Sequence, residues 1–188
     1  MMTRKTLAVV LVSLVSLVTG VALFQLWTPE RTFSEIQSFK PELSQPQLPV
    51  SLQEIPLISL DGANKKLGDW KQQILVVNFW APWCVPCRRE VPDLIALQTE
   101  YGDQVQVLGL ALDSAENIIS FADEYAMNYP SFLASSHIPM YNAIFGNASG
   151  ALPFTVIIDS ERNISYSHTG QISLVELRKQ VLKLLHPI

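Results

Sequence analysis

Hydrophobic and polar residues follow two patterns from about residue 55 onward. Short apolar runs rich in β-branched and aromatic residues, bounded by turn-forming residues, predict β-strands. Longer stretches in which apolar residues recur three and four positions apart predict helices. The predicted strands are residues 55–60, 65–67, 74–80, 105–112, 129–134, 154–158 and 164–168. The predicted helices are residues 84–101, a helix after Ser114, residues 138–145 and a final helix after Ser173.

The order of these elements is β-hairpin, β, α, β, α, β, α, β, β, α. Helices that connect successive strands before a closing hairpin predict an α/β fold with a mixed central sheet and helices on both faces. Residues 74–80 (ILVVNFW) are almost continuously apolar, which is typical of a central strand covered on both faces. The domain expected at residues 54–188, about 135 residues, is long enough to bury such a core.

The N-terminal part of the chain has a different pattern. Residues 7–27 form a run of 21 residues without a charge. As a helix this run is about 31 Å long, which matches the ~30 Å hydrocarbon core of a bilayer. Arg4 and Lys5 precede it, so the positive-inside rule places residues 1–6 in the cytoplasm and the rest of the chain outside.

A cleavable signal peptide is the alternative interpretation. Its apolar core is usually about 7–15 residues long and is followed by a small-x-small cleavage site. Here the run is longer, and the best such site, residues 20–22, lies inside it, so we expect an uncleaved signal anchor. Both interpretations place residues 28–188 on the same side of the membrane, where disulfides persist.

Residues 28–53 are interpreted as a tether between anchor and domain. They contain four prolines and no sustained helical or strand period, which is typical of a linker. A flexible coil of some 25 residues averages roughly 25–30 Å from end to end. The predicted organisation is therefore anchor, proline-rich linker and one exported domain.

Composition narrows the function classes. The 188 residues are 48% hydrophobic and 16% charged, with a formal net charge of −4. This composition argues against a disordered chain, and it lacks the basic character that nucleic-acid binding needs. With only two cysteines, Cys84 and Cys87, the chain is neither a disulfide-rich scaffold nor a four-cysteine zinc site.

The two cysteines lie where a buried strand leads into a helix. At this position free backbone N–H groups and the helix dipole stabilise a thiolate on Cys84, while Cys87, one turn further on, is more shielded and suits a resolving role. A structural staple across so short a loop stabilises little, and the three histidines lack the spacing to complete a zinc site. The pattern favours redox activity over both alternatives.

Two stretches resemble a known family. Residues 78–92 (NFWAPWCVPCRREVP) and 152–159 (LPFTVIID) resemble the thioredoxin fold, and within it the membrane-anchored TlpA/ResA/CcmG (DsbE)-like thiol-disulfide oxidoreductases. The resemblance covers roughly residues 55–185. It implies a thioredoxin-like fold with a central insertion, and no cofactor besides the redox-active disulfide Cys84–Cys87.

The resemblance also implies roles for single residues. Pro153 would follow a cis bond, face the cysteine pair and leave the backbone of Leu152 free to pair with an extended substrate. The expected substrate-binding residues are Trp83, Val85, Pro86, Leu152 and Pro153. Pro92 matches a proline that kinks the active-site helix, which is a structural role.

Glu90 is the third expected catalytic residue beside Cys84 and Cys87. It follows Cys87 by three positions, so both share a helix face, and the resemblance implies that its carboxyl group influences cysteine titration or relays a proton. The residues alone favour a plain first-turn glutamate that interacts with the helix dipole. Ordinary thioredoxins carry a buried aspartate where this chain has Asn78, and an amide cannot relay a proton.

The expected function is membrane-tethered reduction of protein disulfides outside the cytoplasm. By resemblance, the domain lies in the periplasm on a single-pass inner-membrane anchor, and a DsbD/CcdA-like membrane carrier supplies electrons. Apocytochrome c cysteines or thiols of metal-site assembly are the expected clients. A DsbA-like thiol oxidase and a non-catalytic binding or chaperone module remain as alternatives. A peroxidase is disfavoured, since neither cysteine follows a Pro-Thr pair.

Overall fold

The computed structural model describes Phe24 and residues 51–186. Apart from Phe24, the predicted anchor at residues 7–27 lies outside the described residues, as does the linker up to residue 50. Among the residues that are described, no helix combines the length and the apolar character needed to cross a membrane.

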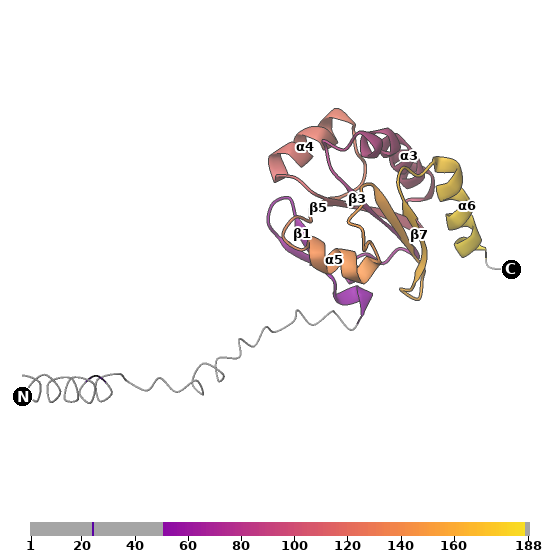
Figure 1. The fold of residues 1–188 in the computed structure, drawn as a ribbon. Helices are drawn as coiled ribbons and strands as arrows, with labels where there is room; N and C mark the ends of the chain where they lie inside the picture. The colour runs from indigo at the N-terminus through magenta and orange to yellow at the C-terminus, as the bar shows by residue number, and fades with distance from the viewer. Residues whose placement is uncertain (1–23, 25–50, 187–188) are drawn as a thin grey trace, which may run out of the picture. The chain divides into compact units, whose positions relative to one another are not determined.

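The described domain contains seven strands and four α-helices, and their order is the predicted one (Figure 1). The strands are β1 (Pro56–Ser59), β2 (Asn64–Lys66), β3 (Ile74–Trp80), β4 (Val105–Ala111), β5 (Ser131–Leu133), β6 (Phe154–Ile158) and β7 (Ile164–Thr169). The helices are α3 (Val85–Tyr101), α4 (Ala115–Glu124), α5 (Ile138–Phe145) and α6 (Leu174–Leu185). Single 3₁₀ turns cover Leu52–Glu54 and Leu67–Asp69.

All seven strands form one mixed sheet in the order β2-β1-β5-β4-β3-β6-β7. β3 pairs in parallel with β4 and antiparallel with β6, so it lies inside the sheet. Every residue of β3 is buried. The mixed sheet with an N-terminal hairpin therefore confirms the predicted α/β architecture.

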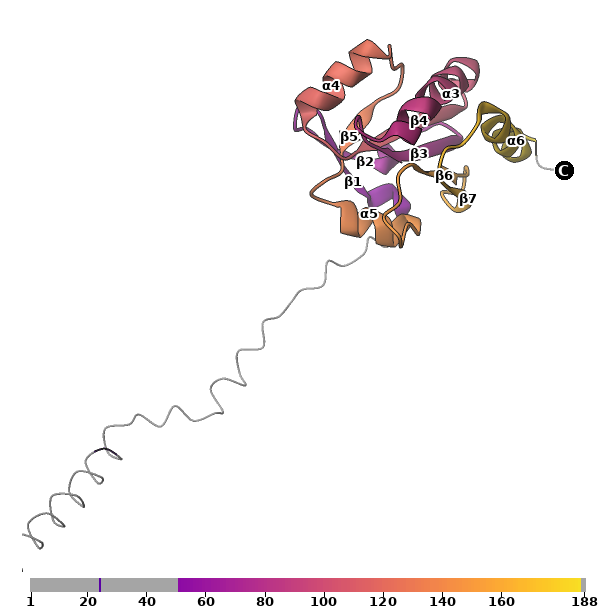
Figure 2. The ribbon, with the colours of Figure 1, turned by 45° about the horizontal axis from the view of Figure 1, so that its top comes forward.

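Helices cover both faces of the sheet. On one face, Tyr141 and Phe145 of α5 pack against apolar side chains of β3 and β4. On the other, α3 and α6 pack against alternate residues of the same strands, and Phe121 of α4 packs against Trp80. Figures 1 and 2 show α5 on one side of the sheet and α3, α4 and α6 on the opposite side.

A row of small and polar residues crosses the sheet on the face that α3 covers. Asn78 of β3 is paired with Thr155 of β6 and with Gly109 of β4, and Gly109 is paired with Ser131 of β5. A Cβ atom on Gly109 would lie 2.5 Å from Ser131 Oγ and 2.7 Å from Trp80 Nε1. These distances are too short for a Cβ contact, so a side chain at this position would force Ser131 or Trp80 to shift.

Replacing Gly109 by alanine should therefore destabilise the domain. Overpacking of a buried site typically costs about 1–3 kcal/mol, and we expect Gly109→Ala to lower the free energy of unfolding by this amount in urea titrations. Adding Ser131→Ala, which removes the closest contact, should restore part of the loss. An alanine variant as stable as the wild type would contradict the close approach at Gly109.

Candidate active site

The site is built where β3 ends and α3 begins. Residues 81–83 form the connection, and Cys84 is the N-cap of α3. Its sulfur accepts a hydrogen bond from the Cys87 backbone N–H at 3.3 Å. Pro86 lies in the first turn of the helix, where a missing N–H costs nothing because this group has no intrahelical partner.

Cys84 and Cys87 form a disulfide with a Cα–Cα distance of 5.2 Å. Cys84 is 6% exposed and Cys87 is completely buried. In the reduced protein, the Cys87 N–H and the helix N-terminus stabilise a thiolate on Cys84. A reagent arriving from solvent therefore meets the sulfur of Cys84 before that of Cys87.

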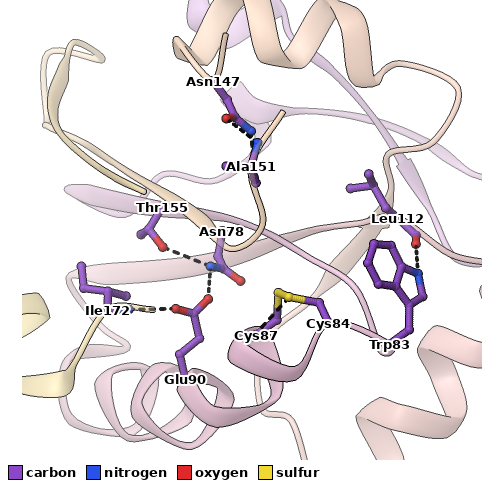
Figure 3. The surroundings of a disulfide bond; sticks show 10 residues. All are labelled: Asn78, Trp83, Cys84, Cys87, Glu90, Leu112, Asn147, Ala151, Thr155 and Ile172. Atoms are coloured by element: carbon purple, nitrogen blue, oxygen red, sulfur yellow. Dashed lines mark hydrogen bonds between the residues drawn. A yellow bond between two sulfur atoms is a disulfide. The ribbon is translucent and has the colours of Figure 1, made fainter. Parts of the chain in front are cut away.

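Two side chains next to the disulfide are apolar and exposed. Trp83 is 64% exposed and Val85 is 57% exposed, and Pro86 beside them is half-buried. The indole Nε1 of Trp83 donates to the Leu112 carbonyl oxygen at 3.3 Å, which holds the ring at the rim of the site (Figure 3). Large exposed apolar side chains at a surface of this kind are typical of an interaction site.

The loop before β6 provides the other side of the site. The Leu152–Pro153 peptide bond is cis, as the resemblance implies. Leu152 is half-buried and packs against the apolar cluster that contains both cysteines. The five expected substrate-binding residues therefore come from two segments, the start of α3 and the loop before β6, on either side of the disulfide.

Glu90 is completely buried in α3 on the sheet side of the helix. Its Oε1 accepts a hydrogen bond from Asn78 Nδ2 at 2.7 Å, and its Oε2 accepts one from the Ile172 backbone N–H at 3.0 Å (Figure 3). Asn78 Nδ2 also donates to Thr155 Oγ1 at 3.1 Å. Burial raises the pKa of Glu90 to about 7, although the bonds from Ile172 and Asn78 oppose this shift.

The structure adds contacts that sequence reasoning missed. Thr155 lies within residues 152–159, but its contact with Asn78 depends on the β3–β6 register. The backbone of Ile172 carries no sequence signal for its bond to Glu90. Arg88 holds its guanidinium over the stacked rings of Phe121 and Tyr125 and thereby joins α3 to α4.

The described residues contain no cluster of three or more His, Cys, Asp or Glu side chains arranged to hold a metal ion. Their reactive group is the cysteine pair.

Comparison with known proteins agrees with this geometry. Residues 47–167 match the model of the AhpC/TSA family. The chain is 33% identical over 132 residues to the thioredoxin-like protein YneN of Bacillus subtilis, an alignment that covers 68% of this chain and 75% of the relative. The chain belongs to the AhpC/TSA family.

Two further similarities concern activity and fold. The chain is 29% identical over 133 residues to the thiol-disulfide oxidoreductase ResA of Geobacillus thermodenitrificans, covering 70% of this chain and 74% of the relative. A thiol:disulfide interchange protein of Chlorobium tepidum superposes with a TM-score of 0.64 at 24% identity, covering 72% and 96% of the two chains. This AhpC/TSA-family protein is a thiol-disulfide oxidoreductase with a thioredoxin-like fold.

The raised pKa of Glu90 predicts how stability depends on pH. The folded protein holds this proton up to about pH 7, whereas the unfolded chain releases it near the ordinary glutamate pKa of 4.5. The stabilisation is therefore complete below pH 4.5 and is lost as pH rises towards 7, by about 3 kcal/mol. Urea denaturation of the oxidised protein between pH 4.5 and 8 should show this decline, and Glu90→Gln should abolish it.

The matched control is Glu100→Gln on the surface of the same helix. A hydrogen bond from Arg178 lowers the pKa of Glu100, so Glu100 does not titrate in this window and its variant should keep the wild-type slope. Equal slopes for Glu90→Gln and the wild type would show that Glu90 does not carry the pH dependence.

Proposed function

We propose that this oxidoreductase is a membrane-tethered reductase that reduces disulfides of client proteins in the periplasm of a bacterium. The observation that carries the proposal is the arrangement of the cysteines. Cys84 caps α3 at the surface beside exposed Trp83 and Val85, and Cys87 is completely buried one turn further on. This arrangement suits one thiol that attacks and a second that resolves.

The reaction takes place in two exchanges. The Cys84 thiolate attacks a client disulfide, forms a mixed disulfide and releases one client sulfur as a thiolate. Cys87 then loses its proton and attacks the Cys84 sulfur, which restores the Cys84–Cys87 disulfide and releases the second client sulfur. Two electrons pass to the client, and the pair becomes oxidised.

Glu90 is proposed to accept the proton that Cys87 must lose. The two residues are three positions apart in α3, and both side chains are completely buried, so water has little access to the Cys87 thiol. A group with a pKa of about 7 is suited to accept and return a proton near neutral pH. Because burial raises this pKa, Glu90 can take up a proton near neutral pH inside the domain.

The client chain is proposed to bind between Trp83, Val85 and Pro86 on one side and the Leu152–Pro153 segment on the other. Within the described part of the chain, neither the N–H nor the C=O of Leu152 takes part in a hydrogen bond. These two groups are therefore available to pair with an extended client backbone, which is a common mode of peptide recognition.

The proposed electron donor is a DsbD/CcdA-like membrane carrier. The chain has two cysteines, so after each cycle the disulfide must be reduced by another protein. The proposed anchor is residues 7–27, preceded by Arg4 and Lys5, with residues 28–53 as the tether. The proposed clients are cysteines of apocytochrome c or thiols used in metal-site assembly.

A Cys87→Ser variant should trap clients, because serine cannot resolve the mixed disulfide on Cys84. A peptide with the Cys-x-x-Cys-His sequence of a haem attachment site, in its disulfide form, should become bonded to this variant. In cells, the trapped clients should be found in the membrane fraction and be released by dithiothreitol. Cys84→Ser is the matched control, and equal trapping by both variants would contradict the assigned order of attack.

The reduction potential separates a reductase from a thiol oxidase. We expect equilibration with a glutathione buffer to give a potential well below −200 mV, whereas a value near −120 mV would indicate an oxidase. The fraction of oxidised Cys84–Cys87 can be read from thiol alkylation and mass. A pair that does not exchange with glutathione at all would instead favour a binding module.

A further inference from the structure

The loop between α5 and β6 contains a buried asparagine that binds its own backbone. After α5 ends, Gly146 adopts a left-handed conformation with φ of 79°, and the chain then reverses. The side chain of Asn147 is 2% exposed. Its Oδ1 accepts from the Ala151 N–H at 3.0 Å, and its Nδ2 donates to the Ala151 carbonyl oxygen at 3.1 Å (Figure 3).

These bonds occupy both backbone groups of the residue that precedes Leu152. On the other side of Leu152, Pro153 has no N–H, and its carbonyl oxygen accepts from the Gly170 N–H at 2.8 Å. Leu152 thus lies between two residues whose backbone groups are already used, while its own N–H and C=O form no hydrogen bond with the described part of the chain. Only one residue of the segment is therefore open to a client backbone.

We propose that Asn147 is a positioning residue for disulfide exchange: by binding both backbone groups of Ala151, it holds the Leu152–Pro153 segment beside Cys84 and Cys87 and restricts pairing with the client to Leu152. The inference rests on the proposed function in one respect, namely that the client backbone pairs with Leu152. Beyond the proposed function, Asn147 would determine the register in which the client backbone pairs with Leu152. Asn147 itself touches neither the client nor the reacting sulfur atoms.

The chemistry of the side chain explains why an amide fits here. One carboxamide carries an acceptor and a donor side by side, and the Ala151 backbone presents the matching donor and acceptor. An alanine at position 147 would leave the N–H and the carbonyl oxygen of Ala151 without their partner. A buried polar group that loses its hydrogen bond destabilises the fold. Aspartate would keep the bond from the Ala151 N–H but would place a second oxygen against the Ala151 carbonyl oxygen.

The test compares two substrates that differ in whether they have a backbone to pair. One is the disulfide form of a peptide of about ten residues with the Cys-x-x-Cys-His sequence. The other is 5,5′-dithiobis(2-nitrobenzoate), a small aromatic disulfide without a peptide backbone. The second-order rate constant of the reduced full-length protein is measured for each, in the wild type, Asn147→Ala and Asn147→Asp.

We expect both variants to reduce the peptide about 10- to 100-fold more slowly than the wild type, because misplacing a binding segment by about 1 Å has effects of this size. Their rate constants with the small disulfide should stay within about twofold of the wild-type value. Their reduction potentials should stay near that of the wild type. Ser149→Ala is the matched control, since Ser149 is exposed in the same loop and its hydroxyl donates a long hydrogen bond, 3.5 Å, to Asn147 Oδ1. It should behave as the wild type with both substrates.

Other results overturn the proposal. Equal losses with both substrates, or no loss with the peptide, would show that Asn147 does not position the client. If Asn147→Ala does not fold, as judged by circular dichroism, the two substrates are compared with Asn147→Asp alone. If neither variant folds, Asn147 has a structural role and the proposal is wrong. A wild-type protein that reduces the small disulfide but not the peptide would contradict the proposed function, which is a separate outcome.

Discussion

Burial of β3 on both faces is the constraint on which the rest of the structure depends. All seven residues of this strand are buried. The apolar clusters on the two faces of the sheet therefore fix the position of both ends of β3. Because α3 begins a few residues after Trp80, the N-cap position of Cys84 is fixed by the same strand. Antiparallel pairing with β6 then places the Leu152–Pro153 segment at the same end of β3. The two halves of the site meet because they belong to neighbouring strands.

The only polar residue of β3, Asn78, is hydrogen-bonded to the buried Glu90 behind the disulfide. Its amide donates to Glu90 and to Thr155, so it supports a carboxyl group without bringing a second one into the core. An aspartate here would repel an ionised Glu90 at close range, and the two carboxyl groups would titrate as a coupled pair. With asparagine, Glu90 is the carboxyl group of this network, and we propose that proton exchange takes place on it. In this proposal the proton is held by Glu90 of α3, whereas ordinary thioredoxins have an aspartate on the strand.

The sequence predicts those parts of the fold that local patterns determine. The bounds of β3, α5 and β6 are the predicted ones. β3 and β6 are almost continuous apolar runs, and α5 ends at Gly146, which adopts a left-handed conformation. The predicted strand 129–134 is shorter, since Pro130 cannot donate to a ladder and only Ser131–Leu133 pairs as a strand. At the site, the cysteine pair could be predicted from its local motif. The bonds of Glu90 to Asn78 and of Asn147 to Ala151 could not, because register and loop geometry decide them.

The difference in burial between the two cysteines has a consequence for partner choice. In the proposed reaction, Cys84 meets a client only where the client chain fits beside it, and Leu152 and Trp83 are proposed to limit that approach. Cys87 is reached only from Cys84, within the same helical turn, so the second exchange is intramolecular and needs no diffusion. In the proposed reaction we therefore expect a mixed disulfide to be resolved quickly once it forms, and selectivity to be exercised at the first attack. For this reason the residues that hold the Leu152 segment, rather than those around Cys87, are where client preference is expected to differ among related proteins.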